Sequence, residues 1–261
     1  MLTLTNIQKT FAIGTVNEKK ALQGVDLHLD AGDFVTVLGS NGAGKSTLFG
    51  AIAGSFRPDT GSVVLDGQDI TAMPDYRRSK FIGRLFQDPL RGTAPNMTIE
   101  ENMALAYLRA SHSRSPFSTI TKRDREGFRE KLSMLDLGLE DRMNHPVGLL
   151  SGGQRQALTL LMATLVTPKL LLLDEHTAAL DPATAEKVLA LTKKIVAENN
   201  ITCLMITHNV PSALRLGNRT IMMKDGRIVL ELQGQERANM TPEDLLKAFH
   251  VETDRILFSA E

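Results

Sequence analysis

Eight residues near the start of the chain, GSNGAGKS at 39–46, restrict its possible folds more than any other feature. They fit the pattern G-x-x-x-x-G-K-[ST], in which glycines let the backbone curl so that successive amides point inward at phosphate oxygens. A β-branched apolar run at 34–38 precedes them and predicts a buried strand, and the apolar residues of 47–53 recur at helical spacing. A strand, a glycine loop and a helix in this order predict a site for the phosphates of a nucleoside triphosphate.

Two side chains of this stretch carry specific expectations. Lys45 would reach the β- and γ-phosphates, and the hydroxyl of Ser46 would ligate a Mg²⁺ ion bound with them. The alternative is a glycine turn that ends in a surface lysine. The strand and the helix on either side favour the phosphate loop, because that loop needs both of them.

A second apolar run, Leu170–Asp174, ends in a carboxylate and is followed at once by Glu175. In an open α/β sheet, ligands bind beyond the carboxyl ends of the strands. Asp174 suits Mg²⁺, since a hard cation held by phosphates needs only one or two protein carboxylates. Glu175 suits a base that orients or polarises an attacking water. A strand that runs into a solvated turn would give the same pattern, but the glycine loop upstream favours the catalytic interpretation.

The segment LSGGQ at 150–154 is the next strong signal. Ser151 is placed to cap an apolar-periodic helix over 156–165, and two glycines leave the first amides of that helix accessible. Such a helix terminus can bind an anion. An ordinary N-cap with a glycine turn is the alternative, and a glycine pair alone does not decide between them.

Three single residues matter because of their positions. Gln87 follows a strand-like run over 81–86, so it could reach Mg²⁺ or the attacking water. His208 follows the strand-like run 202–206, which places an imidazole at the same edge of the sheet as the acids. Phe11 could stack on a purine ring, although a phenylalanine of the core would look the same in the sequence.

The predicted elements are β-rich at first, then helical, then mixed. Residues 2–8 alternate as a short edge strand would, and runs at 25–29 and 62–65 predict further strands. From about residue 98 to 165 helical signals dominate, beginning with a capping-box pattern at Thr98. The remaining predictions are a loop at 111–121, helices at 122–135 and from 181, a strand at 202–206, a hairpin around 225–226 and a helix from 241. We therefore expect an α/β chain with an inserted helical part.

Composition excludes several classes of protein. Lysine plus arginine equals aspartate plus glutamate at 30 each, so the chain lacks the basic excess that a nucleic-acid binder usually carries. Its single cysteine, Cys203, excludes an internal disulfide or a cysteine-rich zinc site. We see no secretory leader, and no apolar segment approaches the length of a membrane span. The expectation is a cytoplasmic protein that does not bind nucleic acid.

Together these motifs resemble those of the ATP-binding cassette (ABC) ATPases. The resembling motifs are, in chain order, the Walker A loop at 39–47, the Q-loop glutamine Gln87, the signature at 150–154, Walker B with its catalytic glutamate at 170–175, the D-loop at 179–181 and the switch histidine His208. The resemblance covers nearly the whole chain, and the signature sequence is highly specific.

The resemblance implies a RecA-like P-loop NTPase core, an N-terminal antiparallel β subdomain and an inserted α-helical subdomain. A single domain over 1–261 would contain the β subdomain and the core at 1–88 and 166–261, and the helical insert at 89–165 would carry the signature. The implied cofactors are ATP and Mg²⁺. In this family two copies pair head to tail, so each ATP would lie between the Walker A loop of one copy and the signature of the other.

The resemblance also implies roles for individual residues. Glu175 would polarise water, His208 would contact the γ-phosphate, and Gln87 and Lys45 would complete the catalytic set. The implied metal ligands are Ser46, Gln87 and Asp174. The implied nucleotide contacts are Phe11, Gly39, Ser40, Asn41, Gly42, Ala43, Gly44, Lys45, Ser46, Thr47, Ser151, Gly152, Gly153, Gln154 and Asp181.

Three positions depart from the usual pattern of the family. His176 follows the glutamate where proline is common, and Asn209 follows the switch histidine where an acid is usual. Met162 stands in the signature helix where arginine is frequent. None of the three removes a catalytic group, so ATPase activity is still expected.

The leading functional hypothesis is the ATPase of a transporter, bound peripherally at the cytoplasmic face of the membrane. Its partners would be a second ATPase subunit (expected to be an identical copy), separate transmembrane permease subunits and a substrate-binding protein. Segments 86–95 and 174–181 look like a bacterial subgroup often associated with amino-acid-type uptake, so we expect import of a small solute. The alternative is a soluble ABC ATPase that serves an assembly process, such as building iron–sulfur clusters.

Overall fold

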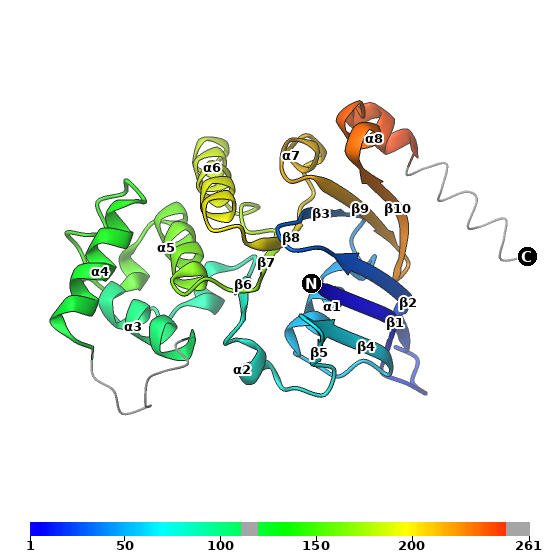
Figure 1. Cartoon of the computed structure of the whole chain (residues 1–261), viewed down its shortest axis with the longest axis horizontal. Helices are drawn as coiled ribbons and strands as arrows, with labels where there is room; N and C mark the ends of the chain where they lie inside the picture. Colours follow the sequence, from blue (N-terminus) through cyan, green and yellow to red (C-terminus); the bar gives the residue numbers. More distant parts are fainter. Residues whose placement is uncertain (111–119, 249–261) are drawn as a thin grey trace, which may run out of the picture. The chain divides into compact units, whose positions relative to one another are not determined.

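The computed structural model describes residues 1–110 and 120–248, and most of the loop predicted at 111–121 lies outside these ranges. The chain forms two compact units (Figure 1). The first contains residues 1–78 and 202–248, and the second contains Ser79–Ile201. Within the described ranges, no helix has the length and apolar character needed to cross a membrane. The boundaries predicted for the helical insert, 89 and 165, stay a prediction.

The first unit contains an antiparallel sheet in the order β2-β1-β4-β5. Its strands are β1 Leu2–Phe11, β2 Lys19–Leu29, β4 Thr60–Leu65 and β5 Gln68–Asp69. Asp66 and Gly67 connect β4 to β5 with φ angles of 49° and 75°, as a tight hairpin turn requires. The antiparallel β part expected near the N-terminus is therefore confirmed.

The strand β1 differs from its prediction in both place and pattern. It is not an edge strand, because it pairs with β2 on one side and with β4 on the other. The predicted alternation also breaks at Asn6, where φ is 46° and the pairing register shifts. Beyond this bulge Ile7 is buried, as Leu2 and Leu4 are, whereas Asn6 is exposed. A bulge inserts one residue into the pairing, so strict alternation could not place Ile7 correctly.

The other strands of the first unit follow the order β10-β9-β3-β8. They are β3 Phe34–Leu38, β8 Thr202–Ile206, β9 Arg219–Lys224 and β10 Arg227–Gln233. The strand β3 is parallel to both β8 and β9, and β9 and β10 form the predicted antiparallel hairpin. Every residue of β3 and β8 is buried, which explains why both strands read as continuous apolar runs.

The helices of the first unit are α1 Lys45–Ala53, α2 Asp75–Arg78, α7 Val210–Arg215, α8 Gly234–Ala238 and a segment at 242–248. The segment at 242–248 confirms the helix predicted from residue 241. The helix α7 packs on β3, and α8 packs on β9 and β10 (Figure 1). The sequence did not predict α2, α7 and α8, because each is too short to show a helical period.

A buried arginine, Arg78, closes the C-terminal end of α1. Its guanidinium donates hydrogen bonds to the carbonyl oxygens of Ala51 and Ile52 at 2.8 and 2.7 Å. It also donates to those of Met73 and Thr71 at 2.8 and 3.0 Å. Burial lowers the pKa of Arg78, but a cation at a helix C-terminus complements the macrodipole. The side chain therefore ties α1 to the segment that leads into α2.

In the second unit, β6 Ile82–Leu85 pairs in parallel with β7 Leu170–Asp174. The helices described here are α3 Ile99–Ala110, α4 Lys122–Ser133, α5 Gly152–Thr164 and α6 Pro182–Glu198, with short 3₁₀ helices η1 Pro89–Gly92 and η2 Val147–Leu149. Buried side chains of α3, α4 and α5, among them Met103, Phe128 and Leu158, form one hydrophobic core. The predicted helical stretch is therefore present, and it folds around its own core.

Candidate functional site

The glycine loop between β3 and α1 has a backbone that glycine adopts far more readily than other residues. Gly39, Gly42 and Gly44 have φ angles of 146°, 84° and 101°, all with the positive sign that disfavours a side chain. Space is restricted as well. A Cβ on Gly44 would lie 2.6 Å from the carbonyl oxygen of Ala21, and a Cβ on Gly39 would collide with the carbonyl oxygen of Met223. The loop is therefore held in a curled shape.

The turn between β9 and β10 supports this loop. The amide of Gly226 donates to the carbonyl oxygen of Ala43 at 3.0 Å. The carbonyl oxygen of Gly226 accepts from the amide of Gln23 at 2.9 Å, and the side-chain amide of Gln23 donates to the carbonyl oxygen of Asp225 at 2.7 Å. The shape of the glycine loop thus depends on residues far along the chain, which no local sequence pattern indicated.

The helix α1 begins directly after the loop, and no side chain caps its first turn. The ammonium group of Lys45 donates to the carbonyl oxygens of Gly39 and Ser40 at 2.7 and 2.9 Å. Lys45 is only 5% exposed, whereas Ser46 is exposed. A helix N-terminus without a cap carries partial positive charge and favours an anion. The curled loop, the helix end and the lysine can together hold a phosphate group.

His208 lies at the same edge of the first unit's sheet as the glycine loop. The strands β3 and β8 are parallel, with Val37 paired to Ile206, so both end at that edge. The amide of Thr207 donates to the carbonyl oxygen of Val37 at 3.2 Å, and His208 follows with an exposed side chain. The structure therefore places His208 just beyond the carboxyl end of β8, and its predicted place beside the acids of the second unit stays a prediction.

Asn209, which departs from the usual family pattern, is the N-cap of α7. Its Oδ1 accepts a hydrogen bond from the amide of Ser212 at 2.7 Å, and its own amide donates to Oγ1 of Thr207 at 3.1 Å. Asparagine caps a helix about as well as aspartate does. An amide at this position therefore preserves the local structure next to His208.

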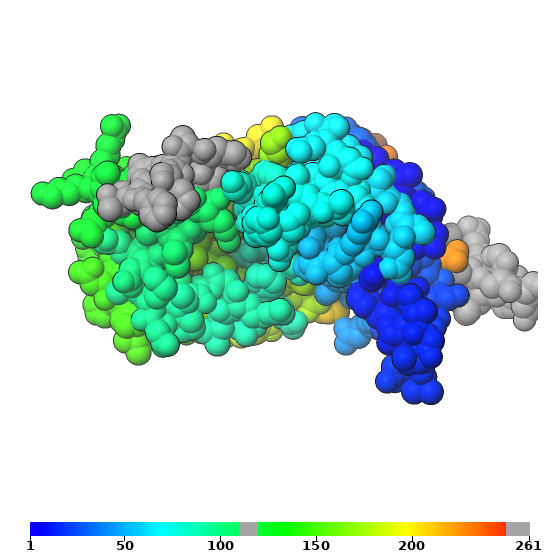
Figure 2. Space-filling view, turned by 90° about the horizontal axis from the view of Figure 1, so that it is seen from below, coloured from blue at the N-terminus to red at the C-terminus, as the bar shows by residue number. Residues whose placement is uncertain are grey.

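Phe11 is the last residue of β1 and is 39% exposed. Its ring is therefore not part of the hydrophobic core, although neighbouring side chains cover part of it. It packs edge-to-face on Phe56, with the ring centroids 5.4 Å apart. The ammonium of Lys9 lies 5.6 Å from each ring centroid and bonds the carboxylate of Asp59 at 2.6 Å, which lowers the pKa of that carboxyl. The loop at 12–18 that follows Phe11 is exposed throughout, and in Figure 2 the dark-blue N-terminal part stands out from the surface.

In the second unit, Gln87 and the two acids follow neighbouring parallel strands. Leu85 of β6 pairs with Leu173 of β7, so both strands end at one edge. Asp174 is the last residue of β7, and Glu175 follows with a half-buried side chain and a φ angle of 47°. A positive φ at a residue other than glycine costs about 1 kcal/mol or more, and such strain often occurs at functional positions. Gln87 is exposed beyond the end of β6.

His176 is a buried structural residue rather than part of the exposed edge. It is 3% exposed, and its Nε2 lies 3.1 Å from Oγ1 of Thr192 on α6. That hydroxyl donates its proton to the carbonyl oxygen of Val188 at 2.8 Å, so Nε2 of His176 must be the donor in the first bond. Burial lowers the pKa of His176 to about 4, which keeps the ring neutral at pH 7. The histidine therefore anchors the segment after Glu175 to α6.

The predicted signature segment forms the first turn of α5, and its cap is complete. Oγ of Ser151 accepts from the amide of Gln154 at 3.3 Å, and the side chain of Gln154 accepts from the amide of Ser151 at 3.1 Å. Ser151 and Gly152 are exposed, whereas Gly153 is buried. A Cβ on Gly153 would collide with the side chain of Thr184. Gly153 thus permits the close approach of α5 to the first turn of α6.

Asp181 is the N-cap of α6, as Ser151 is the N-cap of α5. Its Oδ1 accepts from the amide of Thr184 at 3.1 Å, and Pro182 occupies the first helical position. Hydrogen bonds from the side chain and the amide of Thr184 lower the pKa of Asp181. The same threonine contacts the signature turn, so the structure brings Asp181 and residues 151–154 close together.

Two side chains of α5 refine the sequence interpretation. Arg155, which the sequence analysis did not single out, donates to the carbonyl oxygens of Val147, Gly148 and Leu150 at 3.4, 3.1 and 2.9 Å. It therefore fixes the segment that enters the signature. Met162 is partly buried and packs against the hydrophobic core of the second unit. Hydrogen bonds from an arginine side chain to backbone carbonyls leave no pattern in the sequence, so the sequence could not have indicated the role of Arg155.

The oxygen donors expected to hold Mg²⁺ are chemically suitable. Ser46 offers a hydroxyl, Gln87 an amide oxygen and Asp174 a carboxylate, which are the ligand types that Mg²⁺ prefers. Over the ranges that the structure covers, no cluster of three or more His, Cys, Asp or Glu side chains could hold a metal ion. The donor set therefore fits an ion held largely by phosphate oxygens rather than by a cage of protein ligands.

Comparisons with known proteins agree on one family. The family model described as "ABC transporter" matches residues 22–178. The chain is 40% identical to a tyrosine transport ATP-binding protein of Clostridioides difficile, over 95% of this chain and 98% of the relative. It is 37% identical to a phosphonates import ATP-binding protein of Halobacterium salinarum, over 88% of this chain and 78% of the relative. A dimeric structure of a post-hydrolysis state of the ATP-binding cassette MJ0796, bound to ADP and Pi, is similar with a TM-score of 0.77 and 32% identity, over 89% of this chain and 98% of that one.

Proposed function

Because this chain belongs to the ABC transporter family and is an ATPase of that family, we propose that it is the ATP-hydrolysing subunit of an importer for a small solute. The predicted family and α/β fold class, with a RecA-like P-loop core, are confirmed by the same comparisons. The single observation that carries the proposal is the curled glycine loop, which leads into a helix whose first turn no side chain caps. Such an end needs an anion, and ATP supplies one.

The glycine loop binds the triphosphate in this proposal. The amides of residues 39–47 surround the phosphates, the ammonium of Lys45 moves from the loop carbonyls to the β- and γ-phosphates, and the Phe11 ring packs on the adenine. Ser46, Gln87 and Asp174 would hold Mg²⁺, and the bound ion would neutralise part of the negative charge of the phosphates. The exposed position of Ser46 at the start of α1 supports its part in this set.

Hydrolysis needs a base for water and groups that contact the γ-phosphate. Glu175 is the proposed base, because its carboxylate follows β7 directly and is held by a strained backbone. Gln87 orients the water, and His208 donates a hydrogen bond to the γ-phosphate. The exposed positions of Gln87 and His208 at strand ends support these roles.

Two copies of the chain act together in the proposal. Ser151, Gly152, Gly153 and Gln154 contact the ATP bound by the partner, and Asp181 lies beside them at the same interface. Ser151 and Gly152 are exposed at the start of α5, where a phosphate would meet the positive end of the helix. The dimeric state of the similar ATP-binding cassette supports this pairing.

The transport partners are separate membrane proteins. We infer permease subunits that cross the membrane, a peripheral position of this chain at their cytoplasmic face, and a binding protein that delivers the solute. An amino acid is the proposed solute, since the relative with 40% identity is named for tyrosine transport. The relatives described above are named for transport rather than for assembly, which favours this proposal over an iron–sulfur assembly ATPase.

Co-purification tests the transporter assignment. The chain is tagged, native membranes are solubilised gently, and the proteins that accompany the tag are identified by mass spectrometry. A polytopic membrane protein is the expected partner. A soluble partner, together with absence of the chain from the membrane fraction, would overturn the transporter assignment and leave the ATPase assignment intact.

The substitution Glu175→Gln tests the proposed base. The amide keeps the size of the side chain but cannot accept a proton, so turnover should fall at least a hundredfold while ATP binding persists and the dimer becomes more stable. Steady-state phosphate release and size-exclusion chromatography with ATP measure the two effects. Glu126→Gln, at an exposed position of α4, is the matched control. Undiminished hydrolysis in Glu175→Gln would remove this residue from the mechanism.

A further inference from the structure

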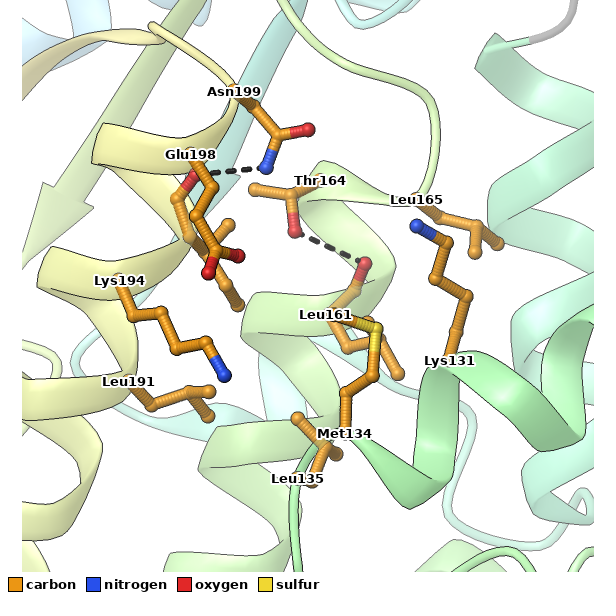
Figure 3. A pocket seen from close by; sticks show the side chains of 11 residues that line it. Lys131, Met134, Leu135, Leu161, Thr164, Leu165, Leu191, Lys194, Glu198 and Asn199 are labelled. Carbon is orange, nitrogen blue, oxygen red and sulfur yellow. Dashed lines mark hydrogen bonds between the residues drawn. The ribbon is translucent and has the colours of Figure 1, made fainter.

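A pocket of about 480 Å³, including space open to solvent, lies within the second unit. It is formed where α4, α5 and α6 approach their C-terminal ends (Figure 3). No residue that lines it belongs to the glycine loop, Walker B, the Q-loop, the signature or the D-loop. Of this space only about 40 Å³ is cavity volume proper, which is room for a small apolar group rather than for a whole ligand.

The floor of this pocket is apolar and buried. Leu135, Leu161 and Ile195 line it and are buried, at 7%, 5% and 8% exposure. Met134 lies at the opening and is 49% exposed. An unbranched, polarisable side chain adapts to the shape of whatever it covers. These residues offer a surface for a branched aliphatic or aromatic group.

Charges of both signs stand around the apolar floor. Figure 3 shows Lys131 on α4, and Lys194 and Glu198 projecting from α6 on the other side. Thr164 and Asn199 also line the pocket, but their donors are engaged: the hydroxyl bonds the carbonyl oxygen of Leu160 at 2.8 Å, and the amide bonds that of Ile195 at 2.9 Å. The charged rim thus consists of two ammonium groups and one carboxylate.

The helix ends add to this pattern. The helices α4, α5 and α6 end at Ser133, Thr164 and Glu198, so three C-termini with partial negative charge surround the pocket. A lone carboxylate ligand would meet this field as well as Glu198, and a lone amine would meet two lysines. A molecule that carries an ammonium and a carboxylate on the same carbon atom can meet charges of both signs at once.

We propose that this pocket binds a zwitterionic α-amino acid with an apolar side chain. The ammonium of the ligand lies toward Glu198 and the helix ends, its carboxylate toward Lys131 on the opposite side, and its side chain on the floor at Leu161. Exposed ion pairs contribute little, so the apolar contact supplies most of the affinity. The proposal does not depend on which solute the transporter carries.

The helices that form this pocket also carry functional residues at their other ends. The helix α5 begins after Ser151 and α6 begins after Asp181, and their first turns touch through Gly153 and Thr184. A ligand between the C-terminal ends of α5 and α6 therefore contacts the same two helices that hold the signature and the D-loop.

Binding to the full chain without nucleotide is measured by isothermal titration calorimetry with four probes. They are L-leucine, 4-methylpentanoate, which lacks the amine, 3-methylbutylamine, which lacks the carboxylate, and glycine, which lacks the apolar side chain. We expect L-leucine to bind at least twofold more tightly than the two probes that lack one charged group, and at least tenfold more tightly than glycine. Absence of L-leucine binding, or equal binding of any of the truncated probes, would overturn the proposal.

Two variants locate the site. Glu198→Gln should weaken L-leucine binding about threefold, and Met134→Trp should abolish it by filling the opening. Both residues are exposed, so neither change should unfold the protein. The matched controls are Glu130→Gln on α4 and Lys193→Gln on α6, which are exposed and do not line the pocket. L-leucine binding that survives both test variants, or that the controls weaken equally, would show that the amino acid binds elsewhere.

Discussion

The helices α1 and α5 both begin after glycines, yet their first turns are completed in opposite ways. The helix α5 has a full capping box, in which Ser151 and Gln154 satisfy each other's backbone amides. The helix α1 has Gly44 at its N-cap position and no capping side chain. The ammonium of Lys45, in its first turn, bonds loop carbonyls instead. One helix start is capped by side chains of the protein, and the other has no side-chain cap and so favours an anion there.

This difference separates two ways of using a helix N-terminus. A self-capped terminus keeps its shape without a ligand, so α5 can present an exposed Ser151 and Gly152 to a second molecule. A terminus without a cap depends on its own loop for shape, and there the positive φ angles of Gly42 and Gly44 take the place of a side chain. Substitutions at the start of α1 should therefore weaken ligand binding most. Substitutions at a self-capped helix start that meets no ligand should lower folding stability alone.

Lys45→Ala should have the largest effect. Removal of the ammonium deletes the one cation of the loop that can reach the phosphates, so the Kd for ATP should rise at least a hundredfold, about 3 kcal/mol. Calorimetric titration with ATP and Mg²⁺ measures this change. Lys187→Ala, at an exposed position of α6, is the control. Unchanged affinity in Lys45→Ala would mean that the loop amides alone complete the start of α1.

His176→Leu should remove an acid sensitivity of the segment between Glu175 and α6. The unfolded histidine binds a proton below about pH 6.5 but the folded one only below about pH 4, so stability is full above pH 6.5 and declines as the pH falls toward 4. The decline should reach about 3 kcal/mol. Urea unfolding at pH 7, 5.5 and 4.5 should show it in the natural chain and in His145→Leu, which changes an exposed ring, but not in His176→Leu. An identical decline in His176→Leu would assign the acid sensitivity to other groups.

Gly44→Ala should destabilise the chain by about 2 kcal/mol and weaken ATP binding. The new Cβ combines an unfavourable positive φ with a contact 2.6 Å from the carbonyl oxygen of Ala21. Gly67→Ala is a matched control, because Gly67 has a φ of 75° but nothing within 4 Å of the added atom. The difference between the two variants in urea unfolding therefore measures the steric part alone. Equal losses would show that the loop yields to the new Cβ at no cost.

Ser151→Ala should have the smallest effect on stability, about 1 kcal/mol, as expected for loss of an N-cap. Thr121→Ala removes the equivalent cap of α4, where Thr121 and Asp124 form the same capping box. Both variants should lose similar stability in urea, but only Ser151→Ala should also lower the rate of ATP hydrolysis. If both variants hydrolyse ATP at the natural rate, the hydroxyl of Ser151 serves α5 and not the nucleotide.

The elements that the sequence predicted well share a simple physical cause. The strands β3, β7 and β8 have the predicted bounds, because buried parallel strands are apolar throughout and end abruptly. The capping patterns at Thr98 and Ser151 also mark the observed starts of α3 and α5, since a cap uses residues three positions apart. By contrast, the bulge at Asn6 arises from pairing with other strands, which leaves no local pattern.

The parts of the candidate site that escaped prediction are mostly contacts made by single residues over long distances. Arg78 bonds four backbone carbonyls, and Arg155 bonds three, but arginines on a surface look the same in a sequence. The sequence marked His176 only as a departure from the family pattern. Its bond to Thr192 joins residues 16 positions apart, on separate elements. The sequence was enough to identify the side chains expected to meet a ligand. The side chains that hold them in place could be identified only from the structure.

The hydrogen bond between Gly226 and Ala43 has a consequence for the order in which the protein is made. The glycine loop leaves the ribosome early, but the turn that supports it follows only after nearly all of the described chain has been synthesised. At ordinary rates of translation this interval is on the order of ten seconds or more. During that time the nascent chain holds every residue of the phosphate-binding motif without the scaffold that shapes it. The loop can therefore reach its final shape only late in translation, since the strand β3 that leads into it also waits for its partners β8 and β9.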